Sequence, residues 1–261
     1  MSHSSEPGRF RCCGVLIDGL EPSGATQALL NSRYGQPRRT HLCNAYTLSL
    51  AMRDEQYRDL LNDADINFSD GHYLAMVGRK RGHTNMTERV YGPELMLNTM
   101  SQGRDAGLKH YLYGASESTV TKLKDNLEEK LAGVDIVAAE SPPFRALTED
   151  ESAALVERVH ETKPDIFWVG LGTPRQDQFV AEYAKKLQCT VVPVGAAFDF
   201  WSGNKPMAPE FVRKHGLEWA YRLATEPRRL WKRYLVGNSM FVYGVLTDKR
   251  RNRKLVAGKP G

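Results

Sequence analysis

The residues best suited to chemistry lie in the stretch PDIFWVGLGTPRQDQFV, at positions 164–180. An apolar run passes into Gly170 and Gly172, and a helical pattern begins near Thr173 and Pro174. A strand that turns over glycines into a helix presents free backbone N–H groups to an anion. Thr at the N-cap and Pro in the first turn suit such a start. The stretch therefore predicts a phosphate-binding turn, with a tight turn that binds nothing as the alternative.

The next two side chains, Arg175 and Gln176, fall in the first helical turn and are predicted to meet a phosphate or a base. The full dinucleotide fingerprint G-x-G-x-x-G requires a glycine where Arg175 stands. The pattern therefore does not match a complete nicotinamide-dinucleotide site.

A carboxylate closes another apolar run, in INFSDG at positions 66–71. Asp70 ends this predicted strand and Gly71 follows it. Ligands of parallel sheets bind at the carboxyl ends of the strands, so Asp70 is expected in the ligand crevice. A partly desolvated carboxylate within reach of a hydroxyl is suited to act as a general base. The alternative is an Asp that caps the next helix.

Two further charged patterns have weaker signals. Asp63 and Asp65 form an Asp-x-Asp pair, which many glycosyltransferases use to hold a metal, but the pair precedes its strand. We therefore expect solvated carboxylates there and no metal site. Arg89 precedes Gly92 and Pro93, where a helix is predicted to begin, and could form a second anion position. A surface arginine is the alternative.

The stretch VGAAFDFWSGNKPMAP follows the last predicted strand and is rich in glycine and aromatic residues. Such a segment suits a wall for a sugar or a base, with Phe198 and Asp199 as its predicted contacts. Plain core packing is favoured for Phe198 and Phe200. The four cysteines show no CxxC spacing, and we expect reduced packing residues.

The elements that position these residues alternate between strands and helices. This alternation predicts an α/β fold with a mostly parallel sheet and helices on both faces. From about Pro209 the pattern changes to helical spacing with interleaved arginines, and Pro227 is predicted to start a second helix. We expect an α/β core over 1–207 and a basic helical appendage over 208–261, ending in a disordered tail from Asp248. Strands are expected at 14–18, 40–44, 66–71, 109–116, 134–140, 165–170 and 190–195, and helices at 22–31, within 45–62, and at 117–131, 148–161 and 174–187.

Composition and charge narrow the class of protein further. The chain is 41% hydrophobic and 26% charged, as in ordinary globular proteins, and it has no apolar run of membrane-spanning length. The segment 213–259 holds 13 Lys or Arg and 3 Asp or Glu, a net charge of +10, while the whole chain carries +5. A basic end on a mildly acidic body indicates a polyanionic partner, such as a membrane surface, a nucleic acid or a pyrophosphate.

Taken in order, several stretches resemble one family: CNAYTLSLA, DADINFSDGHYL, ERVYGPEL, DIFWVGLGTPRQDQFV, VPVGAAFDFWSG and GLEWAYRLATEPRRLWKRYLVGN. They are similar to the WecG/TagA/CpsF glycosyltransferases over about Val15 to Phe241. The resemblance implies inverting transfer of a sugar from a UDP-sugar to an undecaprenyl-diphosphate-linked saccharide in bacterial surface polysaccharide assembly. N-acetylmannosamine, its uronic acid and a hexose such as glucose are the donor sugars considered. The resemblance also implies a Rossmann-like, nucleotide-sugar-binding catalytic core over 1–207. It further implies that the protein is cytoplasmic and that its basic appendage lies peripherally on an anionic membrane surface.

The resemblance assigns roles to individual residues. It implies that Asp70 is the base, and that Arg89 and three appendage arginines serve catalysis. The register is open among Arg228, Arg229, Lys232 and Arg233. Many members carry Thr where this chain has Leu42, two residues before the motif Asn, so another group or another sugar is implied here. The residues carried over are Asp70, Arg89, Arg222, Arg229 and Arg233 for catalysis, and Asn44, Gly71, Gly170, Gly172, Thr173, Pro174, Arg175, Gln176, Phe198 and Asp199 for substrate.

Two other functions share some of these features. An NAD-dependent oxidoreductase would have the same sheet but lacks its full glycine pattern here. A nucleic-acid-binding protein would explain the basic end but not the glycine turn or Asp70, so no nucleic-acid partner is expected. No cofactor and no metal are predicted, because arginines and a helix N-terminus could stabilise a leaving diphosphate. Whether the chain forms a homo-oligomer is left open.

Overall fold

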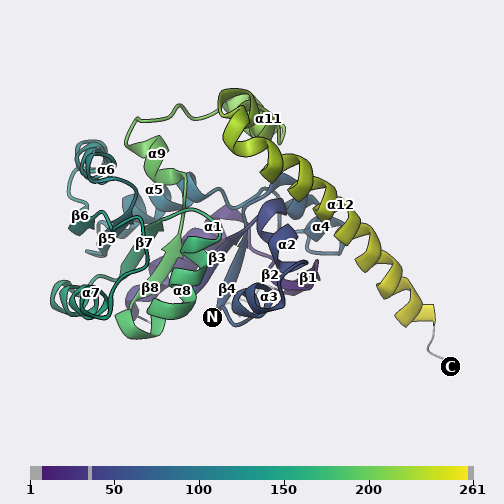
Figure 1. Cartoon of the computed structure of the whole chain (residues 1–261), viewed down its shortest axis with the longest axis horizontal. Coiled ribbons are helices and arrows are strands. Elements are labelled where there is room, and N and C mark those ends of the chain that lie inside the picture. Colours follow the sequence, from purple (N-terminus) through teal and green to yellow (C-terminus); the bar gives the residue numbers. More distant parts are fainter. Residues whose placement is uncertain (1–7, 35–36, 258–261) are drawn as a thin grey trace.

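The computed structural model describes residues 8–34 and 37–257 of the chain (Figure 1). Its centre is a parallel sheet in the order β6-β5-β7-β8, and a parallel pair, β3 and β4, lies beside β8. The hydroxyl of Thr40 in β3 donates to the carbonyl of Val191 in β8 at 3.0 Å. The predicted mostly parallel α/β fold is confirmed. The strands are β1 (Arg9–Cys12), β2 (Val15–Asp18), β3 (Thr40–Cys43), β4 (Ile66–Ser69), β5 (Lys109–Gly114), β6 (Asp135–Glu140), β7 (Ile166–Gly170) and β8 (Thr190–Pro193).

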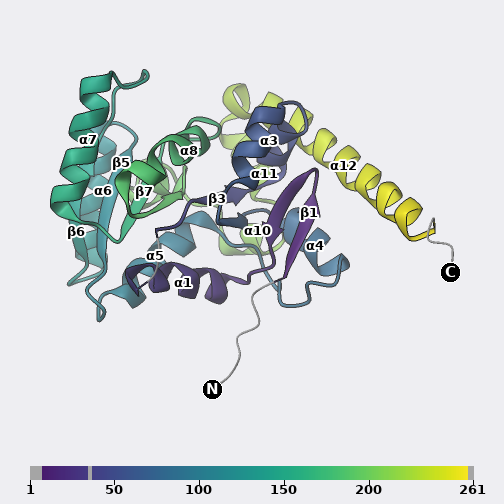
Figure 2. The same ribbon diagram turned by 90° about the horizontal axis from the view of Figure 1, so that it is seen from below.

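Alternation along the central strands divides the core into two layers. Tyr111 and Phe167 pack on one face of the sheet, where they stack with ring centroids 4.7 Å apart. Leu112 and Trp168 pack on the other face. Helices cover both faces, as Figure 2 shows with α1 and α5 on one side and α3 and α8 on the other. The helices of these layers are α1 (Pro22–Leu30), η1 (Asn31–Tyr34), α3 (Glu55–Asn62), α5 (Gly92–Gly103), α6 (Glu117–Lys130), α7 (Glu149–Thr162), α8 (Arg175–Leu187) and α9 (Ala197–Trp201).

A third hydrophobic cluster joins the β1–β2 hairpin to α2 (Ala45–Ala51), α3 and α4 (His72–Lys80). The amide of Asn67 in β4 donates to the carbonyl of Leu16 in β2 at 2.8 Å, which fixes the hairpin beside the parallel pair. The antiparallel strand β1 was not predicted, because its sequence RFRC has too little apolar character to stand out.

The C-terminal segment folds into α10 (Glu210–Lys214), α11 (Glu218–Thr225) and α12 (Pro227–Ala257). α12 begins at Pro227 as predicted and packs along α2, with Phe241 only 5% exposed within the third cluster. The Asp248 carboxylate accepts the Cys13 N–H at 2.7 Å and so binds α12 to the β1–β2 turn. The predicted disordered tail from Asp248 is therefore wrong as far as Ala257, because α12 continues through this segment. Positions 258–261 of that prediction lie outside the described residues.

Candidate active site

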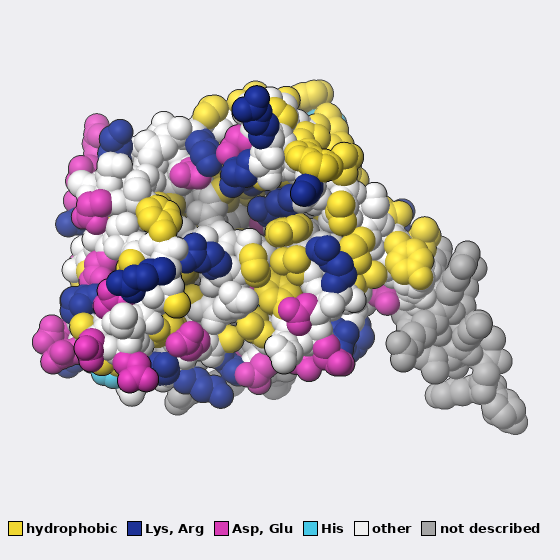
Figure 3. Space-filling view, viewed as in Figure 1, with side chains coloured by type: hydrophobic (Ala, Val, Ile, Leu, Met, Phe, Trp, Pro, Cys, Tyr) yellow, Lys and Arg dark blue, Asp and Glu magenta, His cyan; other side chains and the backbone are white. Residues whose placement is uncertain are grey.

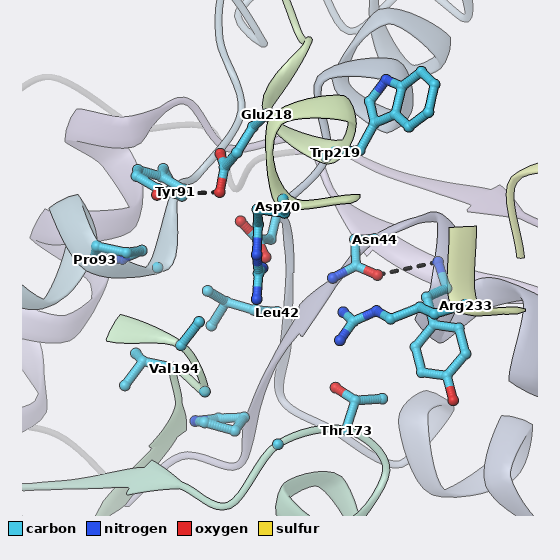
Figure 4. Close-up of a pocket in the computed structure, with 18 of the residues that line it drawn as sticks. Leu42, Asn44, Asp70, Tyr91, Pro93, Thr173, Val194, Glu218, Trp219 and Arg233 are labelled. Atoms are coloured by element: carbon cyan, nitrogen blue, oxygen red, sulfur yellow. Dashed lines mark hydrogen bonds between the residues drawn. The ribbon is translucent and has the colours of Figure 1, made fainter. Parts of the chain in front are cut away.

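A cavity of about 340 Å³ opens where β3, β4, β7 and β8 end, and the C-terminal helices α11 and α12 close it from above. Lys and Arg side chains gather around a hollow on this face of the molecule (Figure 3). The close-up in Figure 4 shows Asn44, Asp70 and Thr173 from the core facing Glu218, Trp219 and Arg233 from the appendage. The parallel sheet thus brings together strand ends that are far apart in sequence, as the crevice rule requires.

The glycine turn after β7 forms one wall of this cavity. Gly172 has φ +75°, a conformation that favours glycine, and its N–H donates to Gln176 Oε1 at 3.1 Å. A Cβ on Gly170 would lie 2.5 Å from the Phe198 ring, so only glycine allows this close approach. Gly170, Gly172, Thr173 and Gln176, which were predicted to bind substrate, line the cavity.

Two details of this turn differ from the prediction. Pro174 rather than Thr173 is the N-cap of α8, and no side chain caps the helix. Arg175 is exposed and, like Pro174, does not line the cavity. Because α8 begins one residue later than predicted, its first side chain turns outward, and Gln176 becomes the inward one.

Asp70 lies at the floor of the cavity, directly after β4. The helix that follows is capped by Gly71, so Asp70 is not a helix cap. Burial raises the pKa of the Asp70 carboxyl to about 6, and the Glu218 carboxylate acts in the same direction. Arg89 and hydrogen bonds from Asn44 and the Gly92 N–H oppose this rise. Asp70 is therefore still mostly ionised at neutral pH but binds a proton more strongly than an ordinary Asp, as a general base requires.

Asn44 is held by the local fold so that its amide group faces Asp70. Its Oδ1 caps α2 and accepts from the N–H groups of Tyr46 at 3.1 Å and Thr47 at 3.3 Å. Because the oxygen is taken by the helix end, the NH₂ group is the part left to donate to Asp70.

Arg89 is half-buried and lines the cavity, so it is not a fully exposed surface arginine. Its guanidinium forms an ion pair with Glu218 of α11 and lies 4.2 Å from the centre of the Tyr91 ring. The Tyr91 hydroxyl donates to Glu218 Oε1 at 3.2 Å. Arg89 therefore joins the core to the appendage, and its charge is already balanced by Glu218.

The appendage supplies three arginines to the cavity. Arg222, Arg229 and Arg233 line it, whereas Arg228 and Lys232 are exposed and lie outside the lining. Arg233 lies 4.6 Å from the centre of the Tyr46 ring, and burial lowers the pKa of its guanidinium. Arg229 also forms an ion pair with Glu226 at 2.7 Å.

Two buried arginine N–H groups at the cavity have no hydrogen-bond partner among the described residues: Arg222 Nε and Arg233 Nε. Buried donors without an acceptor are costly, and acceptor oxygens of a bound anion would satisfy them. Together with the three arginines, they make the upper wall of the cavity suited to a diphosphate.

The remaining wall is mixed in character. Phe198 is 1% exposed and packs in the core, as the sequence favoured, and it also borders the cavity. Asp199 lines the cavity and pairs with Lys205 at 2.7 Å. Leu42 lies in the lining and makes this part apolar.

The possible metal-binding groups lie elsewhere. Asp63 and Asp65 both pair with Arg39 at the amino end of β4, away from the cavity lining. Among the described residues, Cys12, Cys13 and Asp248 have converging ligand atoms, but the Asp248 carboxylate is bound to the Cys13 N–H. All four cysteines are free and buried, as predicted.

The sequence of residues 10–255 matches the model of the glycosyl transferase WecG/TagA/CpsF family. The chain belongs to this family. It is also similar to two proteins named N-acetylglucosaminyldiphosphoundecaprenol N-acetyl-beta-D-mannosaminyltransferase. The one from Bacillus spizizenii is 28% identical over 78% of this chain and 77% of the relative. The one from Bacillus subtilis is 25% identical over 80% of this chain and 79% of the relative.

Among the cavity residues that sequence reasoning did not assign to the site are Tyr91, Glu218 and Trp219. Glu218 and Trp219 stand in the basic, aromatic segment that was interpreted mainly through its arginines. An acid within a run of arginines was the available signal, since such a residue must either face solvent or pair with a buried cation.

Proposed function

We propose that this glycosyltransferase moves a sugar from a UDP-sugar to a lipid-diphosphate-linked saccharide, and that N-acetylmannosamine is the sugar and N-acetylglucosaminyl-diphosphoundecaprenol the acceptor. The names of the two relatives contain this transferred sugar and this acceptor, and the relatives match about four-fifths of the chain. The observation that carries the proposal is the position of Asp70. It is a carboxylate with a raised pKa, and it faces a wall of arginines across one cavity.

The proposed reaction is a single displacement with inversion. The acceptor hydroxyl oxygen attacks the anomeric carbon and Asp70 takes the hydroxyl proton. The bond between that carbon and the donor phosphate oxygen breaks, and UDP leaves with the electron pair. The negative charge that develops on the diphosphate needs fixed cations, and Arg222, Arg229 and Arg233 are suited to this task without a metal ion.

A lipid-linked acceptor requires the cavity to reach a membrane, and α12 offers a surface for this. No helix among the described residues is long and apolar enough to cross a bilayer. One side of α12 is buried against the core through Leu230 and Phe241. On a helical projection the opposite side carries exposed apolar side chains, namely Trp231, Leu235, Val236, Val242, Tyr243 and Leu246.

Figure 3 shows hydrophobic side chains gathered over α11 and α12, close to the Lys and Arg side chains around the hollow. An apolar helix face with nearby cations is the pattern of a helix that lies in the interface of an anionic bilayer. We therefore infer peripheral attachment through α12, with the cavity held near the headgroups.

A transfer assay tests the proposed function. Purified protein is incubated with a synthetic short-chain lipid-diphosphate N-acetylglucosamine acceptor and a panel of UDP-sugars, with NAD and NADH as controls for the oxidoreductase alternative. We expect transfer from UDP-N-acetylmannosamine, and a rise in melting temperature with UDP but not with NAD. Stabilisation by NAD without UDP binding would refute the proposal. If a different UDP-sugar is the best donor, the proposed reaction stands and only the identity of the transferred sugar changes. Leu42, which makes one wall of the cavity apolar, is then the residue to examine for donor choice.

A further inference from the structure

Glu218, the first residue of α11, lies between the appendage and the active site. Its carboxylate is 10% exposed, pairs with the 16%-exposed Arg89 side chain, and accepts the Tyr91 hydroxyl at 3.2 Å. Figure 4 shows Glu218 reaching down from its helix toward Tyr91. These contacts connect residues more than a hundred positions apart, so they exist only when α11 is seated on the core.

Arg89 has two carboxylates as electrostatic neighbours, Glu218 and Asp70. In the structure its ion pair is with Glu218. A guanidinium bound directly to Asp70 would occupy the lone pairs of that carboxylate and lower its proton affinity. Glu218 therefore competes with Asp70 for the same cation.

We propose that Glu218 is a positioning residue that holds the Arg89 guanidinium away from Asp70, so that Asp70 is free to act as a base only when α11 is seated. This inference rests on the proposed role of Asp70. It means that the appendage contributes a carboxylate that controls the base, in addition to its arginines. Seating of α11 would then couple the attachment of the appendage to turnover.

In the described part of the chain, five charged or titratable groups interact with Asp70, and the test must separate Glu218 from the other four. They come from four elements: the segment before α5, α11, α12 and β3. The groups are Arg89, Tyr91, Glu218, Arg233 and Cys43. A substitution of Glu218 alone leaves the other four in place.

The test compares Glu218→Gln with Glu94→Gln. Glu94 pairs with Arg213 and joins α5 to α10, so it is a second ion pair between core and appendage, outside the cavity lining. The Asp70 carboxyl is titrated by ¹³C NMR in the free protein, and the turnover number and donor KM are measured against pH. In Glu218→Gln we expect the pKa of Asp70 to fall by roughly 1 unit, because a negative charge is lost and Arg89 moves closer.

Turnover of Glu218→Gln should fall about 10-fold with a smaller change in donor KM, as expected when Arg89 blocks the base. Glu94→Gln should retain both the wild-type pKa and the wild-type rate. Glu218→Asp keeps the negative charge on α11, so it should restore part of the wild-type pKa of Asp70 and part of the wild-type turnover. It provides a second variant if the Gln form folds poorly. An unchanged pKa of Asp70 in Glu218→Gln, or equal losses in Glu94→Gln, would overturn the proposal. The NMR titration needs no substrate, so failure of every donor would refute the proposed function while leaving the titration to decide the role of Glu218.

Discussion

Gln176 Oε1 accepts a hydrogen bond from the backbone N–H of Gly172 at 3.1 Å, so a side chain of α8 closes the turn that leads into its own helix. A Cβ on Gly195 would lie 3.1 Å from the same oxygen, so the turn after β8 also packs against Gln176. The residue predicted to touch a phosphate therefore holds the two glycine turns in place, and the sugar nucleotide is expected to rest on their backbone.

Replacing Gln176 with Ala should therefore weaken donor binding more than it slows the chemical step. Loss of one buried hydrogen bond of about 1 kcal/mol corresponds to a roughly 5-fold weaker affinity for UDP, measured by calorimetry. Gln178→Ala is the matched control, because Gln178 is exposed on the same helix. Equal UDP affinities in the wild type and Gln176→Ala would show that the turn does not need this contact.

The raised pKa of Asp70 also predicts how Asp70→Asn changes stability with pH. The folded-state pKa of about 6 lies above the unfolded value of about 3.9, so the folded state binds more protons between these values. The contribution of Asp70 to stability is therefore lost as pH rises from about 4 to about 6. Asp70→Asn avoids this loss, so its melting temperature relative to the wild type should be higher at pH 8 than at pH 4. A constant difference would contradict the raised pKa.

Catalysis is predicted to be independent of metal ions. The Asp-x-Asp pair, Asp63 and Asp65, is bound to Arg39 outside the cavity lining, and arginines line the proposed diphosphate position. Excess EDTA should leave the initial rate of transfer within about twofold of the untreated enzyme. Loss of activity that Mn²⁺ or Mg²⁺ restores would disprove this prediction.

The exposed face of α12 should govern attachment to vesicles without governing chemistry. Substituting Leu235, Val242 and Leu246 with Ser removes apolar area from that face only, so binding to anionic vesicles should fall at least 10-fold in sedimentation assays. Turnover of a soluble short-chain acceptor should remain. Arg229→Ala should instead lower turnover and leave most vesicle binding, since it removes one charge from the cavity and leaves the apolar face intact. Point substitutions suit this test because deletion of α12 would remove the buried Leu230 and Phe241 from the core.

Much of the site could be predicted because strand ends are local signals. An apolar run followed by glycine or a carboxylate predicted the positions of Gly170, Gly172 and Asp70, and a parallel sheet necessarily brings such ends to one edge. Helical spacing likewise predicted the two main helices of the appendage and the break at Pro227.

The remainder depended on tertiary contacts that no local pattern encodes. The pairing of Arg89 with Glu218 follows from the docking of α11, and a one-residue shift in the start of α8 turns Arg175 to solvent. The basic stretch after Asp248 has the composition of a tail, yet it continues α12, which is anchored on the β1–β2 turn through Asp248.

The most direct test of a sugar transferase with Asp70 as its base is the pH dependence of transfer by the wild type and Asp70→Asn. With the lipid-diphosphate acceptor and the preferred UDP-sugar, wild-type kcat/KM should decline below about pH 6, where Asp70 becomes protonated. Asp70→Asn should bind UDP normally, lose roughly 10²–10⁴-fold in turnover and show no such decline. A variant that transfers sugar at a near-normal rate with the same acid limb would contradict the assignment of Asp70.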